Sequence, residues 1–398
     1  MGLPKHLTRA DIDALGRELD GIRSEVEESR GERDRAYIVK TIRAQRSLAL
    51  LGRLTMFASL WLLPSLGLPH GSWLAASGVL ALGTALLGLA KIVENMEIGH
   101  NVMHAQWDWM GDPNIQSNTW EWDNVCPSDQ WKHSHNVVHH TWTNVLGKDP
   151  DVGYGVLRVT EAQPWHPRYL AQPLTNFLLM LLFEWGVAVH DLEIEKLVAG
   201  EKDLASVRPM LKRIRWKASR QLLKDVVLWP ALGALAILLS AQLGHASSAR
   251  STLLAFGFIV LGNLGANVIR NVWSNMIIFC GHFPAGVHHF TQDEVDGESR
   301  ADWYVRQLLG SCNIGGGTLF HLLSGNLSHQ IEHHLFPDLP SNRYPEIAPR
   351  IRALAARYDL PYNTGSLLRQ FGTTTWKIWR LSLPGGAFRP AAAGSAAR

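Results

Sequence analysis

The residues of this chain best suited to chemistry are histidines that recur in three separate stretches, which read HNVMH, HNVVHH and QIEHH. Residues four apart lie one above the other on a helix, so each stretch places two potential ligand groups on one helix face. Neutral imidazole is the commonest metal-binding side chain. The seven histidines of these stretches are His100, His104, His135, His139, His140, His333 and His334.

The number of these histidines indicates more than one metal ion. A zinc site needs only three or four protein ligands, so seven histidines exceed one such site. Imidazole also suits iron, copper and nickel. The stretches hold few carboxylates, which separates them from the Glu-x-x-His pattern of soluble di-iron helix bundles. The sequence therefore predicts two metal ions held mainly by histidine.

Other histidines lie near these stretches. His282 follows the last long apolar block and is an eighth candidate ligand. We expect His288 and His289 to form a solvated loop pair, His133 to be solvated, and His329 to be structural or to support a ligand. The neighbouring groups that could orient ligand rings are Asp108, Asn136, Asn144, Asp149 and Glu332.

Four apolar blocks position the histidine stretches relative to a membrane. They occupy residues 48–66, 73–96, 224–243 and 252–275. Each supplies about 20 residues, enough for roughly 30 Å of helix. Short loops join them in two pairs. The sequence predicts an all-α integral membrane protein with four transmembrane helices in two hairpins and a cytosolic helical cap that carries the histidines.

A fifth apolar segment, residues 173–190, is shorter and contains Glu184. We expect it to be interfacial or re-entrant, because a full span would put the third histidine stretch across the membrane from the first two. Lysine and arginine concentrate in 30–46 and 202–220, whereas the two hairpin loops contain only Arg250. By the positive-inside rule, the histidines lie on the cytosolic side.

Residues 1–47 are predicted to form an amphipathic cytosolic helical segment. Thr8 and Asp11 form a candidate capping box, and no signal peptide is expected here. Residues 48–385 then form the membrane domain and 386–398 a flexible tail. The apolar stripe of the first helix consists of Ile12, Leu15, Leu19, Ile22 and Val26. Arg53 lies in the first predicted span, where we expect its side chain to snorkel towards the cytosolic surface.

Composition excludes some other classes. The net charge is only +3, and no basic face is interleaved with aromatic residues, so nucleic acid is not an expected partner. Cys126, Cys280 and Cys312 are odd in number and lack metal-type spacing. They fit a reduced intracellular protein without a disulfide framework.

The three histidine stretches, their order and the two hairpins resemble the membrane fatty acid desaturases. Within that family the text around them, such as ENMEIGHNVMHAQWDWM and SGNLSHQIEHHLFPDLPSNRYPEI, is most similar to the actinobacterial stearoyl-CoA 9-desaturases. The resemblance covers roughly residues 10–385. It implies an enzyme of the bacterial inner membrane that introduces a double bond into a fatty acyl chain, carried by coenzyme A or phospholipid.

The resemblance also implies a cofactor and its ligands. Two iron ions bound by the seven histidines activate O₂, and His282 matches an additional ligand between the second and third stretches. Gln330 stands where many family members have histidine, so it could hold a water or orient a neighbour. Iron with O₂ supplies an oxidant that protein side chains cannot provide.

Electrons are expected from NAD(P)H through a separate carrier, because no His-Pro-Gly-Gly stretch of a fused cytochrome b5 domain is present. A ferredoxin or a flavin oxidoreductase would fit. The basic segment 202–220 could attract an acidic carrier, or it could only obey the positive-inside rule. Several tryptophans between the first two stretches either form an interfacial aromatic belt or line an acyl tunnel.

Two other functions stay open from sequence alone. A hydroxylase on the same scaffold would share the ligands and differ in where the substrate carbon lies. A metal transporter would need ionisable residues near the middle of its spans, and the four blocks contain almost none.

Overall fold

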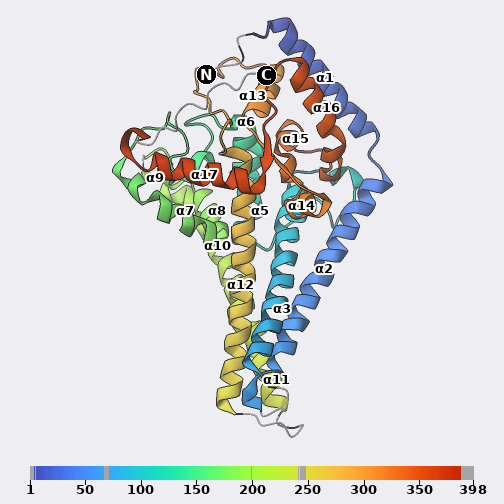
Figure 1. Ribbon diagram of the computed structural model, residues 1–398, viewed down its shortest axis with the longest axis vertical. Helices are drawn as coiled ribbons and strands as arrows, with labels where there is room; N and C mark the ends of the chain where they lie inside the picture. The colour runs from blue at the N-terminus through green and yellow to red at the C-terminus, as the bar shows by residue number, and fades with distance from the viewer. Residues whose placement is uncertain are drawn as a thin grey trace.

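The computed structural model describes residues 4, 6–66, 71–198, 200–240, 242 and 248–386, which form a narrow helical stem below a wider helical cap (Figure 1). The principal helices and strands are α1 (Arg9–Glu28), α2 (Glu32–Leu60), α3 (Trp73–Val93), α4 (Asn101–Met103), α5 (Ser128–Trp131), α6 (His140–Trp142), α7 (Gln172–Leu181), α8 (Phe183–His190), α9 (Ile194–Val198), α10 (Leu204–Leu222), α11 (Trp229–Ser240), α12 (Ala249–His282), α13 (Arg300–Leu309), β1 (Asn313–Gly315), α14 (Thr318–Leu323), α15 (Gln330–Leu335), α16 (Tyr344–Arg357), β2 (Thr364–Ser366) and α17 (Leu367–Leu381).

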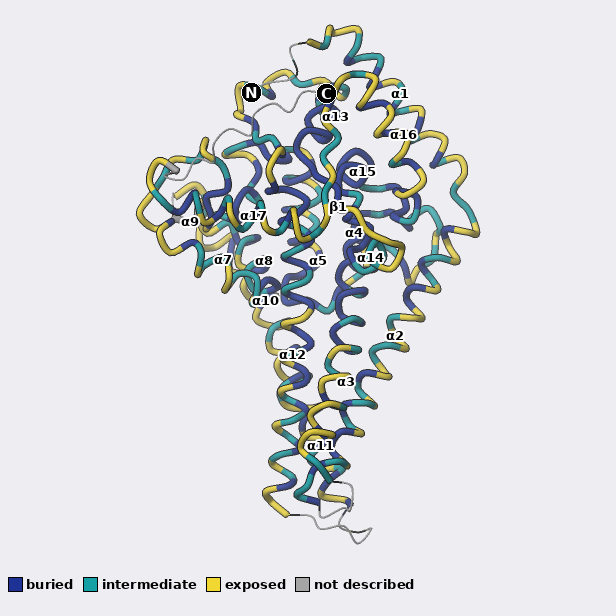
Figure 2. The backbone as a smooth tube through the Cα atoms, in the orientation of Figure 1, coloured by how far each residue is buried: buried dark blue, intermediate teal, exposed yellow. Residues whose placement is uncertain are grey.

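The stem consists of α11 and the cap-distal parts of α2, α3 and α12 (Figure 1). Many leucines on these helices are exposed, among them Leu54, Leu74 and Leu253, while the buried residues concentrate inside the cap (Figure 2). Such an outward apolar surface is typical of helices that face lipid.

Three helical stretches among the described residues are long and apolar enough to cross a membrane: Trp73–Met103, Leu204–Ser240 and Ala249–His282. They contain the second and fourth predicted spans and the third, 224–243, as far as Ser240. The last stretch continues beyond its predicted end at residue 275 to His282. The first predicted span, 48–66, does not meet that criterion, since α2 ends at Leu60 and carries three arginines after residue 42. Most of both hairpin loops and residues 387–398 of the predicted tail lie outside the described residues.

The predicted interfacial segment 173–190 is bent. Helical segments Pro167–Leu181 and Phe183–His190 meet at 103°, the geometry of a broken span or a re-entrant segment. This agrees with the expectation that residues 173–190 do not form one straight span.

The N-terminal segment is divided, which differs from the single helix expected over 1–47. Residues 29–31 interrupt it, because Gly31 adopts an extended conformation and begins α2. The Thr8–Asp11 capping box is present. All five residues of the predicted apolar stripe are buried, and α1 packs on α13 and α16 of the cap.

Buried and partly buried charges form a belt where the stem meets the cap. Lys91 lies 2.8 Å from Asp123 and 3.8 Å from Asp225, and Lys224 lies 2.6 Å from Asp123. Arg53 also turns inward, 3.6 Å from Asp225, so the expectation that it snorkels to the surface is wrong. The Arg53 guanidinium contacts the Asp225 carboxylate and lies over the ring of Trp229. The position of Arg53 in the sequence did not predict these contacts.

The helices α2 and α3 approach closely through glycine. A Cβ atom added to Gly83 would lie 2.7 Å from the backbone nitrogen of Met56 and 2.9 Å from the carbonyl oxygen of Gly52. Gly78, on the exposed side of the same helix, has no described atom within 4 Å of such a position. Small residues therefore set the spacing of this helix pair.

We expect Gly83→Ala to lower the thermal unfolding midpoint in detergent, because the methyl group meets backbone atoms and overpacking costs about 1–3 kcal/mol. Gly78→Ala, the matched control, should leave the midpoint unchanged or raise it, since alanine favours helix by roughly 1 kcal/mol. Circular dichroism of both purified variants measures the difference. Equal midpoints would contradict the close packing described for α2 and α3.

Candidate metal centre

Four segments bring the eight predicted histidines together inside the cap. Two of these segments contain π-helical turns, Glu94–His100 at the end of α3 and Lys132–His139 before α6. A π-helical turn inserts an extra residue and is frequent at functional sites. The end of α12 provides His282, and the buried short helix α15 provides His333 and His334.

The first group of histidines is His100, His104, His135 and His333. One ring nitrogen from each lies within 4.8 Å of the others. The Nε2 atoms of His100 and His135 are 3.4 Å apart. Two nitrogens bound to one metal at ~2.0–2.1 Å lie ~3.0–3.4 Å apart in octahedral or tetrahedral geometry. The group therefore has the dimensions of a metal site.

The second group is His139, His282 and His334, again with ring nitrogens within 4.8 Å of one another. The Nε2 atoms of His282 and His334 are 3.3 Å apart. Gln330 belongs to this side of the centre, since its side-chain amide lies 3.0 Å from His282 Nε2. The same short separation suits two ligands of a second ion.

His140 lies between the two groups. Its ring centroid is 4.8 Å from that of His104 in the first group and 4.5 Å from that of His334 in the second. Its ligand nitrogens also lie within 4.8 Å of those of His333 and His334. The two groups are therefore adjacent parts of one centre.

Burial keeps most of these imidazoles neutral. It lowers the pKa of His104, His140, His333 and His334 well below the usual histidine value, and the neighbouring histidines lower it further. A neutral imidazole has a free lone pair for a metal ion. His139 differs: burial lowers its pKa, but the carboxylates of Asp149 and Asp151 raise it to about 9.

The histidines fit a metal because their inward nitrogens lack other partners. The Nε2 atoms of His104, His139, His140 and His333 are buried and form no hydrogen bond with any described residue. A buried polar atom without a partner costs about 1–3 kcal/mol. Metal ions would satisfy these atoms, and the donor set is the one that imidazole-binding metals accept.

The outer Nδ1 nitrogens of three of the eight clustered rings lie within hydrogen-bond distance of polar side chains. Asp149 lies 3.1 Å from His139 Nδ1, Asn101 3.0 Å from His100 Nδ1, and Gln307 3.0 Å from His334 Nδ1. Such partners fix the tautomer and orientation of a ligand ring.

Of the five orienting groups suggested by sequence proximity, only Asp149 bonds to a clustered histidine; the side chains of Asp108, Asn136, Asn144 and Glu332 bond elsewhere. Asn101 and Gln307 were missed. The first adjoins a candidate ligand in sequence, whereas nothing in the sequence pointed to the second.

Asp151 and His190 are further residues that the sequence interpretation missed. Asp151 lies 3.6 Å from His139 Nδ1 and 3.8 Å from His135 Nδ1, one histidine from each group. His190 Nε2 lies 2.9 Å from the other oxygen of Asp151. The Asp-Pro-Asp run after the second histidine stretch was the available signal.

The remaining histidines stay outside both groups. His133 is exposed, as expected. His288 and His289 are partly buried rather than solvated, and the ring of His289 stacks on Phe283. The pKa of His289 is lowered to about 3 by burial and by Lys377. His329 stacks against His321 with ring centroids 4.6 Å apart.

A narrow cavity of about 60 Å³ adjoins the centre. Its apolar lining includes Met96, Trp122, Trp131, Tyr154 and Phe183. Its polar lining includes seven residues described above: His100, His135, His139, His282, Gln330, Asp151 and His190. Trp122 and Trp131 therefore line this cavity, and the interpretation that tryptophans line an acyl tunnel stays a prediction. The cavity reaches the buried ion pair between Arg270 and Glu184 at the stem side.

Comparisons with known proteins agree with this geometry. The family model for fatty acid desaturase matches residues 71–366. An NADPH-dependent stearoyl-CoA 9-desaturase from Mycobacterium tuberculosis is 50% identical over 379 residues, which cover 95% of this chain and 82% of that protein.

More distant relatives share a smaller part of the chain. Fatty acid desaturase 3 from Homo sapiens is 26% identical over 61% of this chain and 47% of that protein. An acyl-lipid (7-3)-desaturase from Rebecca salina is 29% identical over 56% of this chain and 46% of that protein.

We expect Asp149→Asn to weaken metal retention about 10–100-fold, because the neutral amide orients His139 less strongly. Protein loaded with Fe(II) and dialysed against increasing chelator, followed by metal analysis, measures this loss. Asp293→Asn, on an exposed loop away from the centre, is the control and should retain metal like the unmodified protein. Equal retention by both variants would argue against the role of Asp149.

Proposed function

We propose that this chain, which belongs to the fatty acid desaturase family, introduces a cis double bond into a long-chain acyl-CoA with O₂ as the oxidant. The observation that carries this proposal is the pair of adjacent histidine groups that border one largely apolar cavity. A fatty acyl chain requires such a cavity, and removal of hydrogen from an unactivated chain requires a redox metal.

The eight clustered histidines are the proposed ligands. His100, His104, His135 and His333 would hold one iron ion, and His139, His282 and His334 the other, with His140 between them. Gln330 would orient His282 or a water molecule, since its Oε1 forms no hydrogen bond with any described residue. The iron ions, when bound, supply with O₂ an oxidant strong enough for a methylene C–H bond.

The protein itself orients the groups and excludes water. Asn101, Asp149 and Gln307 fix the rings of three proposed ligands from behind. The aromatic and aliphatic lining would hold two adjacent methylenes beside the centre and keep the cavity dry. The balanced reaction converts one CH₂–CH₂ unit, O₂, two electrons and two protons into one CH=CH unit and two water molecules.

Substrate and electron source are proposed from the relatives. The name of the Mycobacterium tuberculosis relative, half identical over most of this chain, supports stearoyl-CoA as the acyl donor and the 9 position for the double bond. It also supports NADPH as the source of electrons, delivered by a separate ferredoxin or flavin oxidoreductase.

The location of the enzyme is proposed from the distribution of apolar and basic residues. Three helices suited to crossing a membrane all lead from the stem into the cap, and α2 would complete a set of four. The basic residues of 30–46 and 202–220 support a cytosolic cap in a bacterial inner membrane.

A lipid profile of cells that express the chain tests the function. We expect a new monounsaturated acyl chain with its double bond at carbon 9, absent from an empty-vector control and located by mass spectrometry. A product that instead gains one oxygen atom would identify a hydroxylase. No change in any acyl chain, with folded and iron-loaded protein in the membrane, would contradict the proposal.

Single substitutions separate the proposed ligands from neighbouring histidines. His334→Ala should abolish product, because it removes a ligand of the second site, while the protein remains in the membrane fraction. His288→Ala is the matched control and should keep substantial activity, since His288 lies outside both groups. The same lipid profile, normalised to the amount of membrane-bound protein, measures both; activity in His334→Ala would count against the ligand assignment.

A further inference from the structure

We propose that the exposed basic face of α10 docks an acidic electron-carrier protein, and that Trp131 and Trp122 couple this face to the metal centre. The inference rests on the proposed desaturase function, which requires two electrons for each double bond. It names the face where these electrons enter and the residues that lie between that face and the histidines.

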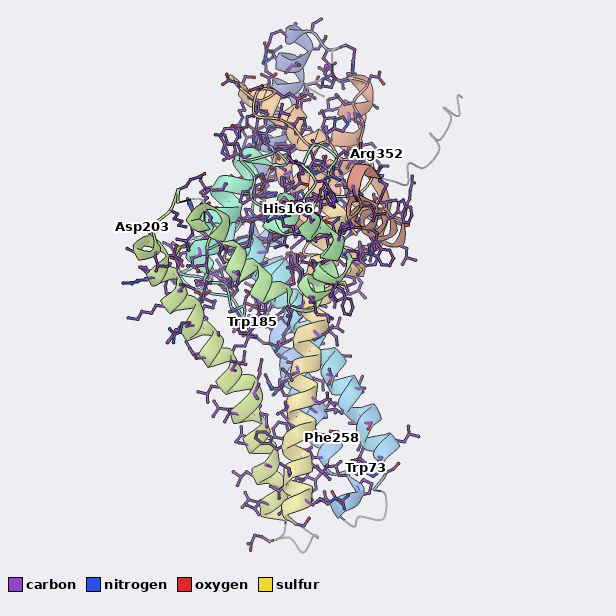
Figure 3. All side chains as sticks on the ribbon, turned by 90° about the vertical axis from the view of Figure 1, so that its left-hand side faces the viewer. Trp73, His166, Trp185, Asp203, Phe258 and Arg352 are labelled. Atoms are coloured by element: carbon purple, nitrogen blue, oxygen red, sulfur yellow. The ribbon has the colours of Figure 1, made fainter. Side chains whose placement is uncertain are left out.

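The basic face consists of Arg208, Lys212 and Arg215, all exposed. None of the three forms an ion pair with any described residue. The continuous helix Leu204–Ser240 has 37 residues. It is therefore about 55 Å long, whereas about 20 residues suffice to cross the hydrocarbon of a membrane. The N-terminal part of the helix, whose start is marked by Asp203 in Figure 3, therefore extends beyond that hydrocarbon on the cap side.

Another face of α10, about 100° around the helix axis from the basic face, covers the two tryptophans. Val207 and Ile214 belong to the same buried apolar cluster as Trp122 and Trp131. Lys217 donates a hydrogen bond from Nζ to the carbonyl oxygen of Trp122 at 3.1 Å. A single helix, about 10–12 Å across with its side chains, thus separates the basic face from the tryptophans.

The two tryptophans lie between α10 and the metal centre, with their rings in contact. The ring of Trp131 stacks on His135 with centroids 4.4 Å apart and planes 21° apart. Trp122 follows at 5.3 Å from Trp131. Electron tunnelling slows steeply as the gaps between atoms widen, and these two ring contacts leave no wide gap between Trp122 and the proposed ligand His135.

Five of the six basic residues on α10 divide into two sets, and the sixth, Arg220, lies over the ring of Trp216. Arg213 pairs with Asp129 and Lys217 pairs with Glu121, which fixes the helix to the segment that carries the tryptophans. Arg208, Lys212 and Arg215 have no such structural task. Complementary charge mainly raises the association rate of a partner, so an acidic protein is the occupant that suits them. Anionic lipid would satisfy the same charges but would give the aromatic path no role.

The electron balance of the reaction requires a reductant as co-reactant. Two reduced carrier molecules of the ferredoxin class each lose one electron. With two protons and O₂, these electrons allow the acyl chain to lose two hydrogen atoms as two water molecules form.

The docking face is tested with charge reversal in the full-length, iron-loaded protein in neutral detergent. A reduced plant-type [2Fe–2S] ferredoxin serves as the probe. R208E/K212E/R215E should raise the KM for this ferredoxin roughly tenfold or more at low salt, and added salt should shrink the difference. The kcat at saturating ferredoxin should stay near that of the unmodified protein.

The matched control is K40E/R43E/R46E, which makes the same charge change on exposed residues of α2. It should leave the KM for ferredoxin unchanged. Equal KM values for both triple variants would overturn the docking face. So would an effect of R208E/K212E/R215E that is seen in anionic vesicles and absent in neutral detergent, since lipid would then be the occupant.

The aromatic path is tested at Trp122, which is one ring removed from the histidines. Trp122→Leu should slow the reduction of the iron centre by docked ferredoxin, followed by stopped-flow absorbance, without changing the KM for ferredoxin. Trp122→Phe should restore most of the rate. Wild-type reduction kinetics in Trp122→Leu would overturn the path.

A separate measurement distinguishes failure of this inference from failure of the proposed function. Stearoyl-CoA and O₂ are supplied to the unmodified protein after reduction with dithionite, and products are analysed. Absence of an unsaturated product would contradict the desaturase function itself. Its presence, together with unaltered ferredoxin kinetics in the variants, would contradict only the electron entry face.

Discussion

The structure depends on the cost of burying imidazole nitrogens that have no partner within the protein. Eight histidines meet at one place, and burial keeps most of them uncharged. Their inward lone pairs cannot bond to one another without a proton between them. Only cations or ordered water can satisfy so many convergent acceptors, so the cap must hold its rings in place for a ligand that it does not itself provide.

The surroundings of the histidines follow from that constraint. Asn101, Asp149 and Gln307 occupy the outward nitrogens and leave the inward ones free. The π-helical turns lie where ordinary helices would have carried the side chains along a straight face. Asp151 contacts one histidine of each group and thereby links the two halves of the centre. Each of these features costs local stability or regularity, and each acts on the direction of a ring.

Much of this arrangement was predictable from sequence because it is periodic or compositionally extreme. Four-residue histidine steps identified the clustered rings, and apolar blocks identified the long helices. The position of His282 at the end of an apolar block placed it correctly beside the other histidines. The predictions that failed concerned single side chains whose partners are distant in sequence. Arg53 was expected at the surface, yet the carboxylate of Asp225 on another helix keeps it inside. Gln307 likewise carries no signal in its own neighbourhood, because its contact with His334 exists only in the folded chain.

The belt of Lys91, Asp123, Asp225 and Lys224 has a consequence for how the protein sits in lipid. These ions link α3, the helix Leu204–Ser240 and the loop that contains Asp123 at one level. His100 follows Lys91 by nine residues, or roughly 14 Å of helix. The height of the reacting atoms above the acyl layer is therefore a property of the polypeptide. When the bilayer thins or thickens as its fatty acids change, the stem below the belt must tilt or the lipid must adjust. The distance between the belt and the metal centre stays the same.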